Sequence, residues 1–218
     1  MPEDSPQVHW NLPDTVDGAW AERRRLAAAI RVLSERCVTT DASVEELAHA
    51  ADSVESLVTR LKPGPTSRDH FLRGTFADTA VELIDRTALM GRSNPWAPPM
   101  RVVVEGAEVR CELAFAEVHV GAPGMVHGGV LSAVMDQLFG YALVMSHRRG
   151  FTGRLTIRYL RPTPLQRAVR CRAWLGEVSG RRVMVHGDLQ LEGEVLVEAE
   201  ALMIQMDSEQ AQQVIRNA

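Results

Sequence analysis

The chain has 218 residues, of which 45% are hydrophobic, so it is long and apolar enough for one domain with a substantial core. Its formal net charge of −4 gives no sign of a partner such as nucleic acid or an anionic membrane. The three cysteines, Cys37, Cys111 and Cys171, form no CxxC pair. Cys111 and Cys171 fall at apolar positions of strand patterns, which favours buried thiols there over a disulfide or a metal site. The first ten residues are acidic and polar and lack the apolar segment of a signal peptide, so we expect a cytoplasmic protein.

The first 99 residues are predicted to form a helical extension that ends in a proline-rich connector. A first helix is expected over residues 17–36, because apolar side chains recur there every three to four positions. Ser43 opens a second helix, where Glu46 completes a capping-box pattern, and Pro63 ends it. Such a pair suits a helical hairpin, a lid or a dimer contact, and nothing in its sequence indicates chemistry.

A β-rich domain is predicted to follow this extension. A short helical pattern over residues 79–90 leads into the proline-rich stretch 93–99, which marks the expected domain boundary. From Met100 the apolar period becomes two, which is typical of antiparallel strands with one buried face. The expected strands cover residues 102–104, 109–115, 155–159, 169–175, 183–191 and 195–203. The domain therefore spans residues 100–207, and the polar tail 208–218 is expected to be frayed.

Residues 129–146 are predicted to form a helix that is buried on all sides. Nearly every residue from 130 to 145 is apolar around the whole helical wheel, which indicates a core helix rather than an amphipathic one. This run is too short to span a bilayer and carries one charge, Asp136, so we expect no membrane-spanning segment. The helix is the nearest cover for the sheet, so the predicted fold class is α+β, with a curved antiparallel sheet wrapped around one central helix.

The turn His127-Gly128-Gly129 lies directly before this helix. Glycines at a helix start expose backbone N–H groups without obstruction by a Cβ atom. These N–H groups lack intrahelical acceptors and lie at the positive end of the helix dipole, so they suit a carbonyl oxygen that becomes an oxyanion. A carboxylate in a buried helix is costly unless it is paired or used, so Asp136 is either a structural cap or a reactive group. Together, the turn and Asp136 indicate acyl chemistry.

These residues resemble a known family, the hotdog-fold thioesterases. The similarity is to the phenylacetate-pathway (PaaI-like) and THEM-type branch of the 4-hydroxybenzoyl-CoA thioesterase superfamily. The matching residues are GAPGMVHGG at 121–129, Asp136, Thr152 and YLRPTPL at 159–165. The resemblance covers about residues 100–206, roughly half of the chain, and does not extend to residues 1–99.

The resemblance implies hydrolysis of a thioester, usually an acyl-CoA, without a metal or an organic cofactor. It implies that Asp136 is the general base or the nucleophile, and that the N–H of Gly128 or Gly129 holds the thioester oxygen. It further implies that the Thr152 hydroxyl orients the attacking water, and that His127 shapes the turn and helps to position the thioester. A general acid is the alternative role for His127. Some relatives carry Asn or Gln six residues before the histidine, where this chain has Gly121, so water activation here has one polar group fewer.

The central helix and the basic residues after it are candidates for substrate binding. Val130, Val134 and Leu138 are expected to line an acyl tunnel, because the edge of a helix that covers a sheet is a natural apolar wall. Arg158 and Arg161 suit the phosphates of CoA through bidentate contacts, and they suit a solvated strand face equally well. We expect no nucleic-acid partner.

The spacing of the candidate residues predicts a homodimer or a pair of dimers. Gly128 and Asp136 lie about 12 Å apart along one helix, which is too far for both to act on one thioester. Two antiparallel helices related by a two-fold axis would bring the turn of one chain to the aspartate of the other. A non-catalytic acyl-CoA-binding or regulatory module is the alternative function, and a hotdog dehydratase is weaker because no acid–base His/Asp pair is evident.

Overall fold

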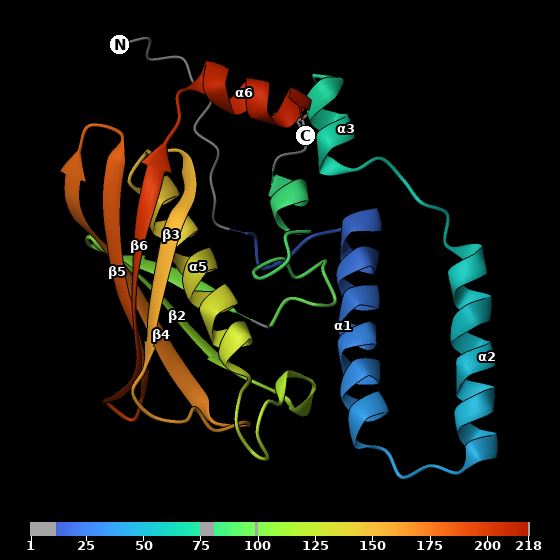
Figure 1. Cartoon of the computed structure of the whole chain (residues 1–218). Helices are drawn as coiled ribbons and strands as arrows, with labels where there is room; N and C mark the ends of the chain where they lie inside the picture. The colour runs from blue at the N-terminus through green and yellow to red at the C-terminus, as the bar shows by residue number, and fades with distance from the viewer. Residues whose placement is uncertain (1–11, 75–80, 99, 218) are drawn as a thin grey trace.

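The computed structural model describes residues 12–74, 81–98 and 100–217. An open six-stranded antiparallel sheet lies on one side of the molecule, with helix α5 across its inner face (Figure 1). The strands, in the order β1-β2-β4-β5-β6-β3, are β1 (Arg101–Glu105), β2 (Glu108–Ala114), β4 (Ala168–Ser179), β5 (Arg182–Leu191), β6 (Glu194–Gln205) and β3 (Gly150–Tyr159). The helices are α1 (Gly18–Thr39), α2 (Val44–Arg60), α3 (Ser67–Leu72), the 3₁₀ helix η1 (Glu117–His119), α5 (Gly128–Met145) and α6 (Ser208–Asn217). This confirms the predicted fold class.

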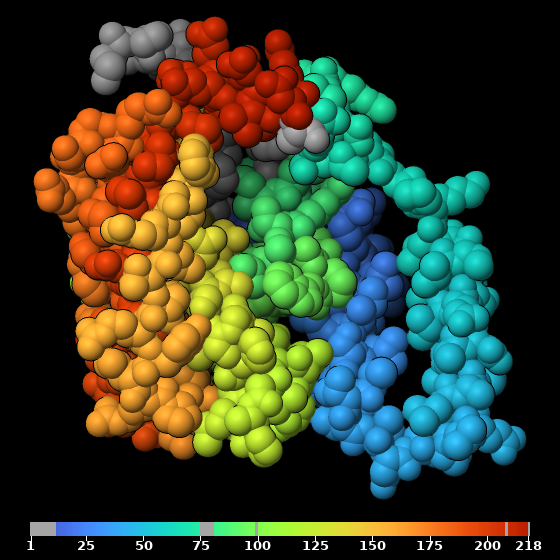
Figure 2. All heavy atoms as spheres, viewed as in Figure 1, coloured from blue at the N-terminus to red at the C-terminus, as the bar shows by residue number. Residues whose placement is uncertain are grey.

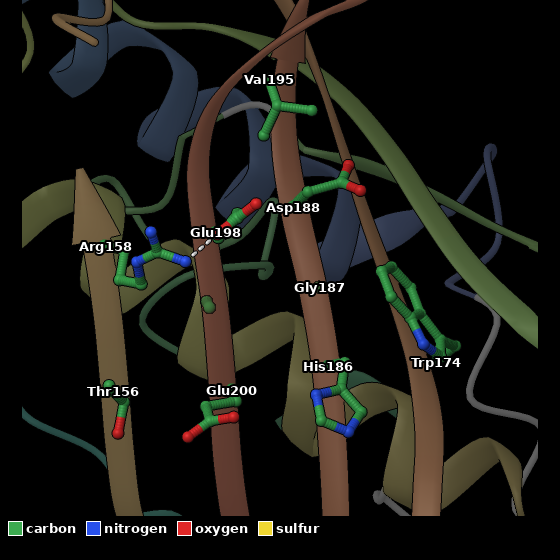
Figure 3. Close-up of a pocket in the computed structure, with 10 residues that line it drawn as sticks. Thr156, Arg158, Trp174, His186, Gly187, Asp188, Val195, Glu198 and Glu200 are labelled. Atoms are coloured by element: carbon green, nitrogen blue, oxygen red, sulfur yellow. Dashed lines mark hydrogen bonds and ion pairs between the residues drawn. The ribbon is translucent and has the colours of Figure 1, made fainter. Parts of the chain in front are cut away.

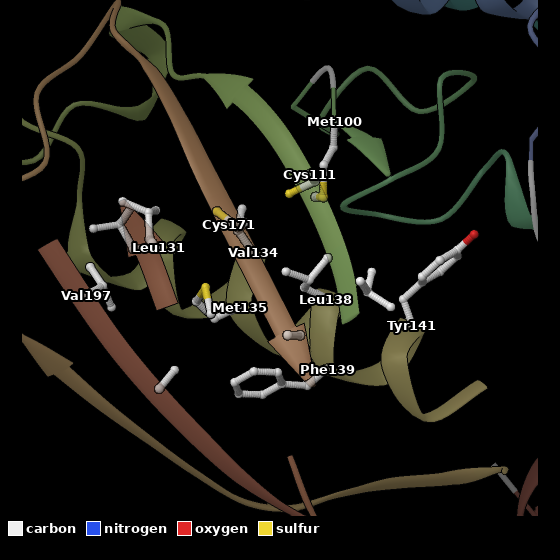
Figure 4. Packing of buried hydrophobic residues seen from close by; sticks show 14 of the residues in the cluster. Met100, Cys111, Leu131, Val134, Met135, Leu138, Phe139, Tyr141, Cys171 and Val197 are labelled. Carbon is white, nitrogen blue, oxygen red and sulfur yellow. The ribbon is translucent and has the colours of Figure 1, made fainter. Parts of the chain in front are cut away.

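Helix α5 supplies the centre of the hydrophobic core. Val134, Met135, Leu138 and Phe139 have no exposed surface and lie in the packed core (Figure 4). Gly187 on β5 permits this close packing, because a Cβ atom there would lie 2.6 Å from a ring carbon of Phe139 and 2.9 Å from the terminal methyl of Met135. By length and composition α5 is also apolar enough to cross a membrane, the one such helix in the described part of the chain. Here it packs on the sheet as a core helix.

Helix α1 is anchored to the rest of the chain by the buried carboxylate of Asp85. Asp85 Oδ2 accepts hydrogen bonds from Trp20 Nε1 at 2.6 Å, Arg24 Nε at 2.8 Å and Ser93 Oγ at 2.6 Å. Burial alone would raise the pKa of this carboxyl, but the hydrogen bonds from Arg24, Ser93 and Trp20 lower it. Asp85 is therefore ionised and ties two residues of α1 to the segment before β1.

Helix α2 stands apart from the body of the protein. Figure 2 shows it as a separate cyan column, with an open gap between much of its length and α1. The predicted capping box at its start is confirmed, because the Glu46 N–H donates to Ser43 Oγ and the Ser43 N–H donates to the Glu46 carboxylate. No residue of α2 is buried, and its exposed apolar side chains are Val44, Leu47, Val54 and Val58.

The helix expected over residues 79–90 is wrong over its second half. Residues 79 and 80 lie outside the described residues, residues 81–84 are helical, and turns follow to Met90. The chain leaves the helix because it wraps around Asp85. The Ser93 N–H donates to the Asp85 carbonyl at 2.9 Å, and the Arg92 N–H donates to the Asp85 carboxylate at 3.0 Å.

The tail after Asp207, expected to be frayed, forms helix α6. Asp207 Oδ1 accepts from the Gln210 N–H at 2.8 Å, and the Gln210 side chain accepts from the Asp207 N–H at 3.3 Å, which is a capping box. At the other end, the Arg68 guanidinium of α3 donates to the carbonyls of Ile215 and Arg216 at 3.2 and 3.1 Å. Both ends of α6 are thus satisfied, and the second contact joins segments too distant in sequence for local patterns to reveal.

Candidate active site

The turn before α5 is built by His127, which is the N-cap of the helix. Its backbone is extended (φ −62°, ψ 131°), and its ring Nδ1 accepts a hydrogen bond from the Gly129 N–H at 3.0 Å. The His127 N–H itself donates to the carbonyl of His119 at 2.9 Å. Because Nδ1 is an acceptor, a neutral His127 ring carries its proton on Nε2. His127 therefore fixes both the backbone of the turn and its own tautomer.

These bonds distinguish the two candidate oxyanion donors. The Gly129 N–H is occupied by the His127 ring, and the Val130 N–H donates to the His127 carbonyl at 2.9 Å. The Gly128 N–H, by contrast, has no acceptor among the residues that the structure describes. It is a half-buried donor at the first position of a helix, where the dipole favours negative charge. Gly128 is thus the donor that is free for a ligand.

Two hydroxyl groups that the sequence analysis did not assign to the site hold Gly128 in place. The Tyr159 hydroxyl donates to the Gly128 carbonyl at 2.8 Å, and the Ser132 hydroxyl donates to it at 3.0 Å. The two hydroxyl oxygens lie 2.6 Å apart. A Cβ atom on Gly128 would come within 3.2 Å of the Tyr159 ring. Ser132 lies one helical turn after Gly128, a spacing that indicates proximity, whereas Tyr159 reaches the turn only through the strand pairing of β3.

Asp136 and Thr152 lie together. The Thr152 hydroxyl donates to Asp136 Oδ1 at 2.7 Å, and both side chains are half-buried. Thr152 is on β3, whose pairing with β6 is interrupted between Thr152 and Arg154. Leu155 and Tyr159 face α5, whereas Arg154 does not. In a regular strand Thr152 would point the same way as Arg154, so the irregularity turns the Thr152 side chain toward the helix. The oxygen lone pairs of Thr152 and the second carboxylate oxygen of Asp136 remain available to a water molecule.

Two of the expected tunnel residues are part of the packed core. Val134 and Leu138 have 0% exposed surface and lie in the packed core (Figure 4). Val130 is only partly buried. An acyl chain could reach Val134 and Leu138 only by displacing core side chains, whereas the other face of the helix is partly exposed. That partly exposed face carries Ala133, Asp136 and Gly140. Shortening Leu138 to Ala would cost about 2–5 kcal/mol of stability and report on packing rather than on chain length.

Arg158 and Arg161 do not meet the Asp136–Thr152 pair. Arg158 points from β3 to the outer face of the sheet, where it forms an exposed ion pair with Glu198 at 2.7 Å (Figure 3). Arg161 pairs with Glu194 at 2.5 Å and is likewise exposed. Arg158 lines an open pocket of about 360 Å³ on that outer face, with Trp174, His186 and Asp188 among its other lining residues. Arg158 lies six residues after Thr152, so both would share one face of a regular strand. The irregularity in β3 lies between them and reverses the facing of the residues after it, which places Arg158 on the opposite face from Thr152.

In the part of the chain that the structure describes, no group of three His, Cys, Asp or Glu side chains could hold a metal ion. The groups that the structure brings to the site are side chains and backbone donors. These are a free N–H at a helix start, a carboxylate that accepts from a hydroxyl, and a half-buried helix face between them. The arrangement suits a neutral carbonyl that gains negative charge while a water molecule loses a proton.

Comparisons with known proteins agree with this chemistry. The family described as "Thioesterase superfamily" matches residues 123–198, which include the donor turn, Asp136 and Thr152. The mouse (Mus musculus) acyl-coenzyme A thioesterase THEM4 is 34% identical over 91 residues, which are 41% of this chain and 39% of that protein. The chain thus spans about two fifths of the length of this curated relative.

A solved structure extends the similarity beyond the β-rich domain. The crystal structure of a thioesterase superfamily protein superposes with a TM-score of 0.72 and 26% sequence identity, and the match covers 89% of this chain and 93% of that chain. A match of that extent reaches well into the N-terminal helices. The chain therefore has the hotdog fold, and its residues 123–198 are similar to the thioesterase superfamily.

Proposed function

We propose that this protein hydrolyses the thioester of an acyl-CoA to a free acid and CoA. The observation that carries the proposal is the free Gly128 N–H on the same helix as an Asp136 carboxylate that accepts from Thr152. The matched family and the named activity of the mouse relative support this reaction class. A binding module would have no need of a carboxylate placed to take a proton.

The proposed reaction follows from the free positions on these groups. Thr152 accepts a hydrogen bond from water while its own hydroxyl donates to Asp136, so the water lies beside the free carboxylate oxygen. Asp136 takes a proton from this water, the water oxygen bonds to the thioester carbon, and the carbonyl oxygen gains the negative charge. The Gly128 N–H stabilises that oxyanion. The C–S bond then breaks, and CoA leaves as a thiolate that takes up the proton. Direct attack by Asp136, with an acyl anhydride hydrolysed afterwards, uses the same groups.

We further propose that each site is formed by two chains. Gly128 and Asp136 are eight residues apart, about 12 Å along α5, whereas one thioester needs both within hydrogen-bond or attack distance. Strand β3 lies at the edge of the sheet, and one side of its backbone has no strand partner among the described residues. Phe151 and Tyr159 on this strand are about half exposed. An edge strand of this kind can pair with its symmetry mate. The half-exposed face of α5 would then meet its counterpart, with Gly128 of one chain beside Asp136 and Thr152 of the other.

We propose a reducing compartment, in keeping with the expected cytoplasmic location. Cys37, Cys111 and Cys171 are free. Cys111 and Cys171 are register partners on β2 and β4, and both are buried. The hydrogen bond from Cys111 and burial raise the pKa of the Cys171 thiol well above its usual value, so it stays protonated and unreactive.

Thioester hydrolysis is tested with protein treated with EDTA and a panel of short, medium, long and aromatic acyl-CoAs. We expect release of free CoA thiol from at least one class of substrate, because the proposed chemistry needs no metal. Dissociation constants for the same acyl-CoAs, measured in parallel, separate the two function classes. Tight binding without release of thiol from any substrate would contradict hydrolysis and support the non-catalytic binding module.

A further inference from the structure

The N-terminal helix α1 makes a direct contact with the segment that leads to the donor turn. The Glu35 carboxylate on α1 accepts hydrogen bonds from the N–H groups of Glu117 and Val118, at 3.0 and 3.1 Å. These are the first two N–H groups of η1, which have no partner within that helix. Glu35 comes 82 residues before Glu117, so a carboxylate of the extension caps a helix of the hotdog domain.

The segment that Glu35 holds is bonded in turn to the donor turn. The His119 carbonyl, at the end of η1, accepts from the His127 N–H at 2.9 Å. The segment also closes on itself, because the His119 ring Nδ1 accepts from the Ala116 N–H at 3.1 Å. Burial lowers the pKa of the His119 ring, which keeps it neutral and able to accept this bond.

The approach between this segment and the donor turn is close enough to transmit a displacement. A Cβ atom on Gly121 would lie 2.8 Å from His127 Cα, so the two stretches of backbone are in contact. Val120 and Val126 form an isolated antiparallel bridge beside them. A shift of η1 therefore moves His127, and through the His127 N-cap it moves the Gly128 N–H.

We propose that Glu35 is a positioning residue for the oxyanion donor, so that the N-terminal extension completes the active site of the hotdog domain. The proposal rests on the thioesterase function proposed above. The path runs from the Glu35 carboxylate to the N–H groups of η1, from the His119 carbonyl to the His127 N–H, and from there to Gly128. Helix α1 can serve as a fixed support for this path because Asp85 anchors its other end through Trp20 and Arg24.

The expected effect separates positioning from substrate affinity. The Glu35 carboxylate accepts from the N–H groups of Glu117 and Val118 and lies outside the donor turn, so its removal should leave acyl-CoA binding largely unchanged. A displaced Gly128 N–H should instead weaken stabilisation of the oxyanion, and misplacement by about 1 Å costs up to about 10²-fold in rate. We expect Glu35→Ala to lower kcat by about 10- to 100-fold with little change in KM. Glu35→Gln, which keeps one carbonyl acceptor, should fall between the wild type and Glu35→Ala.

The matched control is Glu22→Ala on the same helix. Glu22 is 63% exposed, and its one ion-pair partner among the described residues is Arg25, one turn away. Glu22→Ala therefore removes a carboxylate from α1 without touching η1. Its kcat and KM should equal those of the wild type. A second readout does not depend on activity: the backbone amide resonance of Gly128, observed by NMR in the uniformly labelled full chain, should shift in Glu35→Ala and stay in place in Glu22→Ala.

The outcomes separate this inference from the proposed function. If the wild type releases CoA and Glu35→Ala keeps the wild-type kcat, the positioning role is overturned while the thioesterase function stands. If the wild type releases no CoA from any substrate, the proposed function fails. The effect of Glu35 on the donor turn is then tested by the backbone amide resonance of Gly128 alone. A Gly128 resonance that is identical in Glu35→Ala and the wild type would then overturn it. An equal loss of kcat in Glu22→Ala would also overturn it, because the effect would belong to α1 in general.

Discussion

Asp136→Asn is expected to retain the fold and to lower kcat by about 10²–10⁴-fold, which is the usual contribution of a general base. The amide is nearly isosteric with the carboxylate. Its carbonyl oxygen can still accept from the Thr152 hydroxyl, which in the wild type lies 2.7 Å from Asp136 Oδ1. It cannot take a proton from water or attack a thioester carbon. The measurement is steady-state release of CoA thiol from the best substrate, with the melting temperature recorded on the same preparation.

The control for Asp136→Asn is Glu198→Gln. Glu198 is a half-buried carboxylate on the outer face of the sheet, where it pairs with Arg158 and lies on the face opposite α5. This variant makes the same chemical change and should keep the wild-type kcat. If Asp136→Asn turns over at nearly the wild-type rate with a native melting temperature, then Asp136 is a structural residue and the proposed mechanism is wrong.

Gly128→Pro is expected to remove the oxyanion donor while the start of the helix is kept, lowering kcat by about 10²–10³-fold. Proline has no N–H, and it is favoured at the first position of a helix, where the N–H lacks an intrahelical acceptor. The residue before a proline prefers extended backbone, and His127 already has φ −62° and ψ 131°. The chain thus offers a position where one N–H can be deleted without opposing the local conformation.

Gly128→Ala separates loss of the donor from steric effects. Both variants add a Cβ atom, which would lie 3.2 Å from the Tyr159 ring, but only the alanine keeps the N–H. The added Cβ cancels in the ratio of kcat between the alanine and the proline variants, which therefore reports loss of the N–H together with the two further ring carbons of proline. Equal kcat values for the two variants, with both folded, would assign the oxyanion to another donor.

The sequence predicted the parts of the fold that depend on local periodicity. The uniformly apolar segment 129–146 and the alternation after Met100 indicated the central helix and all six strands, because helix and strand periods differ. The capping box at Ser43 is also a local pattern, because it joins residues three positions apart, and the structure confirms it. The similar pattern of Asp207 and Gln210 marks the start of α6, within a tail whose polar composition predicts no regular structure.

The remaining features depend on contacts between segments distant in sequence. Asp85 had no recognisable partners in the sequence, because Trp20 and Arg24 lie more than 60 residues before it. Nothing in the sequence distinguishes Glu35 from other charged residues of α1, because its contact with η1 joins residues 82 positions apart. A helix that is apolar on all sides does not reveal in its sequence which side faces the sheet. The sequence therefore predicts a tunnel position for Leu138, which is fully buried in the structure.

The composite site is tested most directly by a heterodimer of the two inactive variants. One chain carries Asp136→Asn and keeps Gly128, and the other carries Gly128→Pro and keeps Asp136. The chains are co-expressed with different affinity tags, and the doubly purified heterodimer is assayed for release of CoA thiol. If each site takes Gly128 from one chain and Asp136 from its mate, one of the two sites is intact, and the heterodimer should recover about half of the wild-type kcat per dimer. No recovery in a verified heterodimer, or full activity in a protein that sediments as a monomer, would contradict a site shared between two chains.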